Sequence, residues 1–99
     1  MWFVLHTAAL KYPDEPSAAN KKNMYKFVTS LQYVLPCEGC CRGFQAILDR
    51  TAFGAKDLVN SDALFAWSVK AHSMVNEKVG KPARDDWRMW KARYLALAS

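Results

Sequence analysis

Two cysteines stand three positions apart in the sequence Cys37-Glu38-Gly39-Cys40, directly after Pro36 and at the start of a helical pattern. Two cysteines at this spacing can pass between the dithiol and the disulfide form within one turn of helix. A helix N-terminus favours the thiolate, which is the form that attacks disulfides. The same spacing is also half of a typical zinc site, which normally needs a second pair of ligands. The motif therefore predicts either a redox-active pair or part of a zinc site.

The hydrophobic pattern divides the rest of the chain into helices. The first begins near Trp2 and ends at Tyr12-Pro13, and helical spacing of apolar residues predicts further helices over 17–35, 37–49, 61–79 and 85–98. A connection without a clear period covers 50–60. Nothing alternates with period two, so the βαβ context of a thioredoxin-like CxxC is missing. We predict an all-α fold, a four-helix bundle plus a short fifth helix, in one domain over 1–99.

The composition is that of a globular domain with a modest basic excess. Hydrophobic residues make up 52% of the 99 residues, and the formal net charge is +5. The basic residues are scattered, and no zinc-finger, RRM or basic-zipper pattern occurs. No apolar run reaches the roughly 18 residues of a membrane span, and residues 1–10 lack the basic flank of a signal peptide. Three cysteines, an odd number, do not suit a secreted disulfide scaffold.

Two of the predicted helices carry pairs of ring-bearing or polar side chains four residues apart. Trp2 and His6 form one pair, and His72 and Asn76 form the other, so that each pair lies on one helix face. A single histidine on an apolar helix is most often a core residue. Two such pairs in a chain that also has a CxxC motif indicate a functional site.

The chain resembles the Erv/ALR sulfhydryl oxidases, which are small FAD-dependent enzymes built on a helical bundle. Three strings carry the resemblance, in the order of the family and over nearly the whole chain. They are Trp2-x-x-Leu5-His6-Thr7-x-Ala9-x-x-Tyr12-Pro13, Leu35-Pro36-Cys37-x-x-Cys40-x-x-x-Phe44, and Trp67-x4-His72-x-x-Val75-Asn76, which continues into Lys78-Val79-Gly80-Lys81-Pro82.

This resemblance implies a role for each matching residue. Cys37 would exchange with an incoming thiol, and Cys40 would lie beside the flavin and pass electrons to it. FAD would be held at one end of the bundle. Its implied contacts, besides Cys40, are Trp2, His6, Tyr12, Phe44, His72, Val75, Asn76, Lys78, Lys81 and Trp90. Among these, the two lysines would meet the pyrophosphate, and Trp90 would close over the cofactor, with Trp87 as the alternative.

The chain departs from the family pattern at several positions. Gly43 stands where the family usually has histidine, and Ser73 stands where it usually has asparagine. Cys41 is not part of the family motif, and we expect it to be an idle thiol. A second CxxC or CxC shuttle and a further structural cysteine pair are missing from the 99 residues, as are the residues that usually precede the first tryptophan, which suggests truncation.

The resemblance also implies partners and a location. The enzyme would oxidise thiols of a protein dithiol or a small redox protein and pass the electrons to oxygen, which gives hydrogen peroxide. It would be a homodimer that uses its first two helices, without nucleic acid, membrane or metal. The absence of shuttle cysteines looks most like the members from large DNA viruses, which act in the host cytoplasm or virion. The mitochondrial intermembrane space is the alternative.

Two other functions compete with this interpretation. In a zinc-stabilised binding module, Cys37, Cys40, Cys41 and one of His6 or His72 would hold the metal. Against this, adjacent cysteines on a helix point about 100° apart. A basic helical bundle that binds nucleic acid would use the mixed Arg, Lys and Trp residues of 84–93.

Overall fold

The structure, a computed structural model, describes residues 2–78, 88 and 91–92, and this part is all-helical. Its elements are α1 (Trp2–Lys11), α2 (Ala18–Val34), α3 (Glu38–Thr51), the short 3₁₀ helix η1 (Ala55–Asp57) and α4 (Ser61–Lys78). The described residues contain no strand. The predicted all-α fold with four main helices is therefore confirmed. Most of the predicted fifth helix over 85–98 lies outside the described residues.

Side-chain caps set where the helices begin. Ser17 caps α2, because its hydroxyl accepts the N–H of Asn20 at 3.0 Å and the Asn20 side chain accepts the N–H of Ser17 at 2.9 Å. The side-chain oxygen of Asn60 accepts the N–H of Ala63 at 2.7 Å at the start of α4. Pro36 separates α2 from α3, which fits its inability to continue a helix.

The end of α3 differs from the sequence prediction. We expected the helix to end at Asp49, but it continues to Thr51. Its C-cap residue, Ala52, has a left-handed backbone with φ 49°. The connection over 50–60 is also not without structure, since it contains the last residues of α3 and η1. Burial explains the longer helix, because Thr51 is buried on the same side as Ile47 and Leu48.

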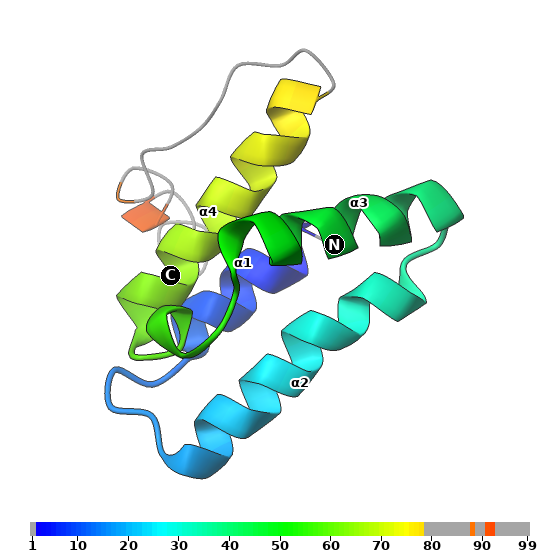
Figure 1. Cartoon of the computed structure of the whole chain (residues 1–99). Helices are drawn as coiled ribbons and strands as arrows, with labels where there is room; N and C mark the ends of the chain where they lie inside the picture. The colour runs from blue at the N-terminus through cyan, green and yellow to red at the C-terminus, as the bar shows by residue number, and fades with distance from the viewer. Residues whose placement is uncertain (1, 79–87, 89–90, 93–99) are drawn as a thin grey trace.

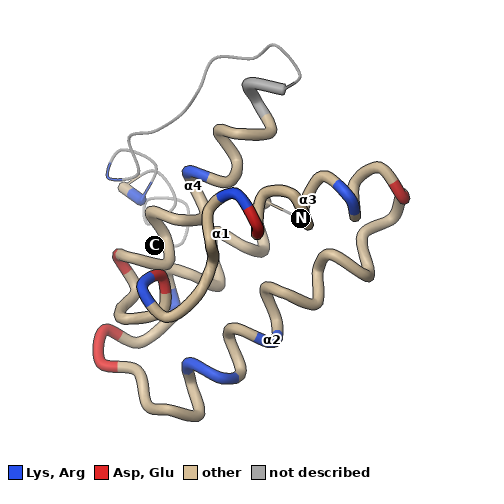
Figure 2. Tube along the Cα trace, viewed as in Figure 1, with Lys and Arg blue, Asp and Glu red and all other residues tan. Residues whose placement is uncertain are grey.

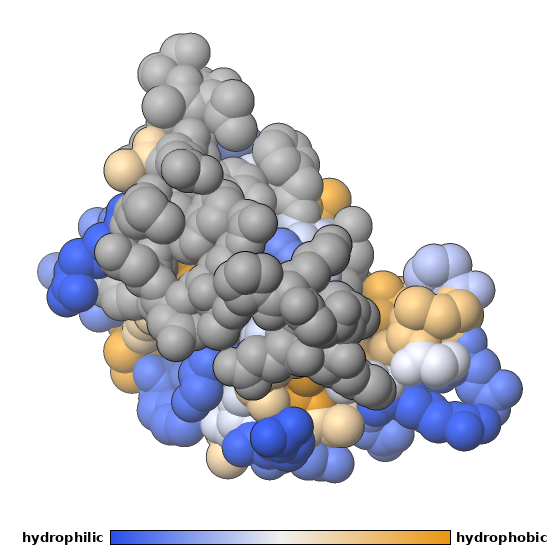
Figure 3. Space-filling view, turned by 90° about the horizontal axis from the view of Figure 1, so that it is seen from above, coloured by the Kyte–Doolittle hydropathy of each residue, from blue (hydrophilic) through white to orange (hydrophobic). Residues whose placement is uncertain are grey.

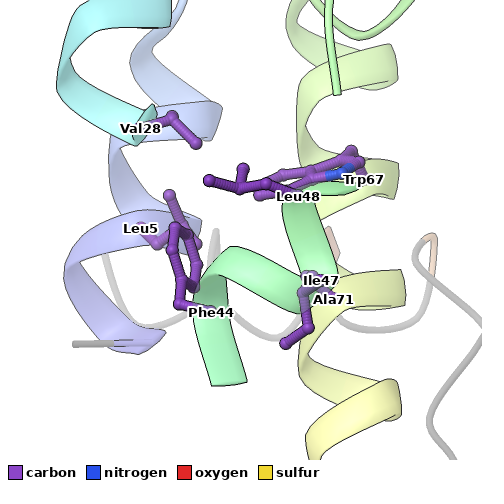
Figure 4. Packing of buried hydrophobic residues seen from close by; sticks show 7 residues of the cluster. All are labelled: Leu5, Val28, Phe44, Ile47, Leu48, Trp67 and Ala71. Atoms are coloured by element: carbon purple, nitrogen blue, oxygen red, sulfur yellow. The ribbon is translucent and has the colours of Figure 1, made fainter. Parts of the chain in front are cut away.

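The helices pack as two pairs (Figure 1). α2 and α3 form a hairpin that turns at Pro36, while α1 packs mainly against α4. One hydrophobic cluster joins all four helices (Figure 4); it consists of Leu5, Val28, Phe44, Ile47, Leu48, Trp67 and Ala71. A second cluster lies around the end of α1 and the start of α4, and consists of Ala9, Tyr12, Leu58, Leu64, Phe65 and Val69. The first cluster fixes α3 relative to α1 and α4.

α2 leaves part of its apolar surface outside the core. Val28 is fully buried, whereas Phe27 is 38% exposed and Val34 is 68% exposed. Apolar colour is visible at the margin of the molecule where α2 meets α3 (Figure 3). This end of the hairpin also carries Cys37.

Lysines and arginines of the described residues lie in small groups on different helices (Figure 2). This distribution agrees with the scattered basic residues seen in the sequence. Within the same part of the chain, no helix has the length and hydropathy needed to cross a membrane.

Thr51 provides a polar link inside the core. Its hydroxyl accepts the indole N–H of Trp67 at 3.0 Å and donates to the carbonyl oxygen of Ile47 at 2.7 Å. Thr51→Val keeps the shape but leaves the buried indole N–H without this acceptor. We expect urea unfolding to show a loss of about 1–3 kcal/mol. Thr29→Val is the matched control, because the Thr29 hydroxyl bonds only to backbone carbonyls of its own helix. Equal stability of the two variants would contradict this role of Thr51.

Candidate active site

Cys37 and Cys40 form a disulfide at the exposed N-terminus of α3, with 5.1 Å between their Cα atoms. Cys37 is the N-cap residue of the helix, and its sulfur accepts the backbone N–H of Cys40 at 3.0 Å. This hydrogen bond and the helix N-terminus both stabilise negative charge on the Cys37 sulfur. The disulfide is therefore open to thiols, and it lies where a thiolate is favoured.

Three rings from two helices form a second group of candidate residues. The ring of Trp2 in α1 stacks on the ring of His72 in α4, with 4.5 Å between centroids and 10° between planes. His6 lies one turn after Trp2, and its Nε2 is 3.3 Å from Nδ1 of His72. The structure therefore brings together the two residue pairs that the sequence placed on separate helices. We call Trp2, His6 and His72 the ring group.

His6 is the most buried member of the ring group, at 2% exposure. Its Nδ1 lies 2.7 Å from the hydroxyl of Ser68. Burial, and in second place the neighbouring His72, lower the pKa of His6 from 6.5 to about 4. His6 is consequently a neutral imidazole at physiological pH, with one protonated and one unprotonated nitrogen.

Phe44 connects the disulfide to the ring group. It lies one helical turn after Cys40 and is buried in the first core cluster together with Leu5, the neighbour of His6 in sequence (Figure 4). Trp2 and Val75 pack against the same cluster. The start of α3, the start of α1 and the second half of α4 are therefore held together by one set of apolar contacts.

The remaining predicted site residues are Tyr12, Asn76, Lys78, Lys81 and Trp90. Tyr12 is not brought to the ring group: it lies in the second core cluster, and its hydroxyl donates to the carbonyl oxygen of Leu58 at 2.7 Å. Burial raises its pKa. Asn76 and Lys78 belong to α4, but their side chains fall outside the described part. Lys81 and Trp90 lie outside the described residues, as does Trp87.

Sequence reasoning missed Ser68, which contacts His6 directly. Its position four residues before His72 was the available signal, since residues at that spacing share a helix face. A serine in the middle of a helix is common, however, and nothing in its type marks it as part of a site.

Cys41 and Gly43 are the two residues of α3 that depart from the family pattern. Cys41 is a free, half-buried thiol, and its sulfur is 3.5 Å from the carbonyl oxygen of Leu35. A Cβ atom added to Gly43 would have no neighbour within 4 Å.

The zinc alternative finds no support, because no group of three or more His, Cys, Asp or Glu in the described ranges could hold a metal ion.

A model of the Erv1 / Alr family matches residues 1–95. The chain belongs to the Erv1 / Alr family. It is 29% identical over 93 residues to the mitochondrial FAD-linked sulfhydryl oxidase ERV1 of Saccharomyces cerevisiae, covering 94% of this chain and 47% of that protein. It is 32% identical over 80 residues to the probable FAD-linked sulfhydryl oxidase R368 of Acanthamoeba polyphaga mimivirus, covering 81% of this chain and 56% of that protein.

Solved structures of the family have the same fold. The crystal structure of the yeast Erv1 core matches with a TM-score of 0.83 and 29% identity, over 94% of this chain and 75% of that one. The FAD-binding domain of Erv1 from Saccharomyces cerevisiae gives the same TM-score and identity, over 94% of this chain and 85% of that one. The chain spans about half the length of the curated relatives that it matches. The family predicted from the sequence is confirmed.

The burial of His6 predicts how the stability of this Erv1 / Alr domain depends on pH. The pKa of His6 is about 4 in the folded protein, below the ordinary value of 6.5. As the pH falls, the unfolded chain therefore takes up a proton at His6 before the folded protein does. His6 therefore contributes stability above pH 6.5 that is lost as the pH falls toward 4. We expect this group to lose about 3 kcal/mol of stability by pH 4, at 1.36 kcal/mol per pKa unit, and about 2 kcal/mol of this loss falls between pH 7 and 5. Urea unfolding between pH 7 and 5 measures this part.

The control for this pH dependence is His6→Gln, which has no titratable group at position 6. Its free energy of unfolding is expected to change less between pH 7 and 5 than that of the wild-type protein. Equal slopes in the two proteins would show that His6 does not take up the proton on unfolding.

Proposed function

We propose that the chain is an FAD-dependent thiol oxidase that forms disulfides in protein substrates, and that residues 1–99 make up a single domain of this kind. One observation carries the proposal. An exposed disulfide lies at the start of a helix whose next turn is buried in the core cluster, and Trp2, which stacks on His72, packs against the same cluster. The relatives from yeast and mimivirus are named FAD-linked sulfhydryl oxidases, which supports the same activity.

The described residues fit a flavin nucleotide by their chemistry. The near-parallel rings of Trp2 and His72 offer flat, half-buried surfaces of the kind that stack on heterocyclic rings. Val75 adds an apolar contact on the same helix. We propose that these residues, with His6, Phe44 and Asn76, hold the cofactor, and that Lys78 and Lys81 neutralise its pyrophosphate. Trp90 is proposed to cover it. Tyr12, whose hydroxyl is bonded to Leu58, is also proposed as a cofactor contact.

The cysteine pair performs thiol–disulfide exchange. A substrate thiolate attacks the sulfur of Cys37, the Cys37–Cys40 bond breaks, and Cys40 leaves as a thiolate. A second substrate thiolate then attacks the substrate sulfur of this mixed disulfide. The substrate leaves as a disulfide, and Cys37 leaves as a thiolate that the N–H of Cys40 stabilises. Two electrons have then passed from the substrate to the cysteine pair.

The cofactor supplies the oxidising power for the next turnover. When bound, FAD accepts the two electrons of the Cys37–Cys40 dithiol and delivers them to oxygen, which becomes hydrogen peroxide. The protein contributes position: Phe44 anchors the turn after Cys40 in the core cluster, and Trp2 of the ring group packs against the same cluster.

We propose that the substrate thiols come directly from a protein dithiol or a small redox protein. Cys41 is the one cysteine of the sequence outside the pair, and its half-buried position next to the carbonyl of Leu35 does not suit a shuttle. A shuttle within these 99 residues would need two further cysteines.

We also propose that the chain forms a homodimer through α1 and α2. The support is the apolar surface that α2 leaves outside the core, which includes Phe27 and Val34 together with Tyr25 and Tyr33. Covering such side chains removes apolar area from water. Sedimentation velocity of the whole chain tests the proposal, since a monomer at micromolar concentration would contradict it.

The biological setting is proposed from the relatives. Similar proteins come from mimivirus and frog virus 3, at 32% and 29% identity, and from yeast and plants at comparable identity. We propose that this is a viral member that acts in the host cytoplasm or the virion. The mitochondrial yeast relative supports the intermembrane space as the alternative. Immunofluorescence in the native cell distinguishes the two locations.

Substitution of single cysteines tests the assigned roles. We expect Cys40→Ser to retain FAD but to lose thiol-dependent oxygen uptake, because no disulfide can form at the pair. Cys41→Ser is the matched control and is expected to keep the wild-type rate. Sustained oxygen uptake by Cys40→Ser, or its loss in Cys41→Ser alone, would overturn the assignment of the redox pair.

A further inference from the structure

The outer side of α2 carries two lysines one turn apart. Lys22, Lys26 and Thr29 are separated by four and three residues, so they share one face of the helix. Val28, which is fully buried, follows two residues after Lys26 and therefore lies about 200° round the helix from it. Both lysines are exposed on the side away from the core. We call Lys22, Lys26 and Thr29 the lysine face.

The lysines of α2 form no ion pair with any described residue. The helix contains Lys21, Lys22 and Lys26 but no aspartate or glutamate. Asp14 and Glu15 precede the helix without pairing with these lysines. The helix dipole does not account for the lysines either, because cations stabilise the last turn of a helix, which has no basic residue in α2. Their charge is therefore available to a negatively charged partner.

The lysine face leads along α2 to the redox pair. Cys37 follows the last turn of this helix, where α2 and α3 meet (Figure 1). Residues 27–37 contain no charged side chain, so the tube between the lysines and Cys37 is tan (Figure 2). At 1.5 Å per residue, Val34 lies about 12 Å from Lys26 and about 18 Å from Lys22 along the helix. An extended chain covers such distances with about four to six residues.

We propose that the lysine face docks an acidic segment of the protein substrate whose cysteine exchanges with Cys37. In such a substrate, aspartate or glutamate residues lie about four to seven positions from the reacting cysteine. Opposite charges bring the segment to α2 before any sulfur reacts, and they raise the rate of encounter. The exchange with Cys37 rests on the proposed function, whereas the docking of an acidic segment does not.

The proposed homodimer and this docking surface use different sides of α2. Phe27 and Val34, which support the dimer, are seven residues apart and share a face about 100° round the helix from Lys26. A dimer that paired the lysine face with itself would place the lysines of two copies against each other, and such like-charge contacts oppose binding. A homodimer that covers Phe27 and Val34 need not cover the lysines.

Two peptide dithiols of equal length test the proposal. Each has a cysteine pair at its centre and charged residues about four to seven positions away on both sides, all glutamate in one peptide and all lysine in the other. We expect the FAD-loaded wild-type chain to oxidise the glutamate peptide with a kcat/KM about tenfold higher, which is within the range of electrostatic steering. In about 0.5 M NaCl the ratio is expected to fall toward one, because salt screens exposed charges.

A pair of double variants locates the effect on the protein. Lys22→Gln/Lys26→Gln neutralises the lysine face, and we expect it to lower the ratio of the two kcat/KM values toward one. The ratio is taken within each protein, so a general change in activity cancels. Lys11→Gln/Lys70→Gln is the matched control, because it removes the same charge from exposed lysines of α1 and α4 and is expected to keep the wild-type ratio. Equal ratios in the two double variants, or no preference in the wild type, would overturn the docking role.

Fluorescence anisotropy measures docking without turnover, with a labelled glutamate peptide that has serine in place of cysteine. Tighter binding to the wild type than to Lys22→Gln/Lys26→Gln supports docking, even if the chain oxidises neither the peptides nor dithiothreitol, a result that would contradict the proposed function alone. Equal binding to both proteins, with normal oxidation of dithiothreitol, would overturn docking and leave the proposed function standing. Lysine-dependent binding to phosphatidylserine vesicles, with equal rates on the two peptides, would assign this face to a membrane surface and also overturn the proposal.

Discussion

The packing of α3 against α1 and α4 is the constraint on which the site depends. Phe44 and Leu48 of α3, Leu5 of α1 and Ala71 of α4 share one buried cluster. The cluster fixes the helix that carries the disulfide relative to the two helices that carry the rings. A shift of α3 would move the cysteines away from the ring group without breaking any covalent link.

A buried polar network accompanies this apolar contact. His6 lies among core residues, where burial disfavours its charged form. Ser68 and His72 provide hydrogen-bond partners for its two ring nitrogens, which makes burial of the neutral ring tolerable. The same network holds the ring of His72 next to His6. The burial of His6 therefore depends on partners from α4.

Most of the fold followed from the sequence, because its signals are local. Apolar spacing and the prolines at 13 and 36 were enough to place the four main helices. The end of α3 was missed because the burial of Thr51, which extends the helix, depends on a partner in α4. The pattern also shows that α2 is amphipathic, but not how much of its surface the other helices cover.

The site was predicted in part. The cysteine pair and the pairs around His6 and His72 were identified from spacing, and the structure brings the two histidines within hydrogen-bonding distance. Ser68 could not be found in this way, because its importance depends on a contact across 62 positions of the chain. The cofactor contact of Tyr12 stays a prediction, and the structure shows only that its hydroxyl is bonded to the backbone of Leu58.

The most direct test of the central claim is the visible spectrum of the purified chain, recorded in air before and after dithiothreitol is added, with dissolved oxygen measured in the same cuvette. We expect a flavin absorption band that bleaches as the Cys37–Cys40 pair is reduced and passes on its electrons, and that returns when the thiol is exhausted while oxygen is consumed. A folded, colourless protein that consumes no oxygen even after FAD is added would contradict the account.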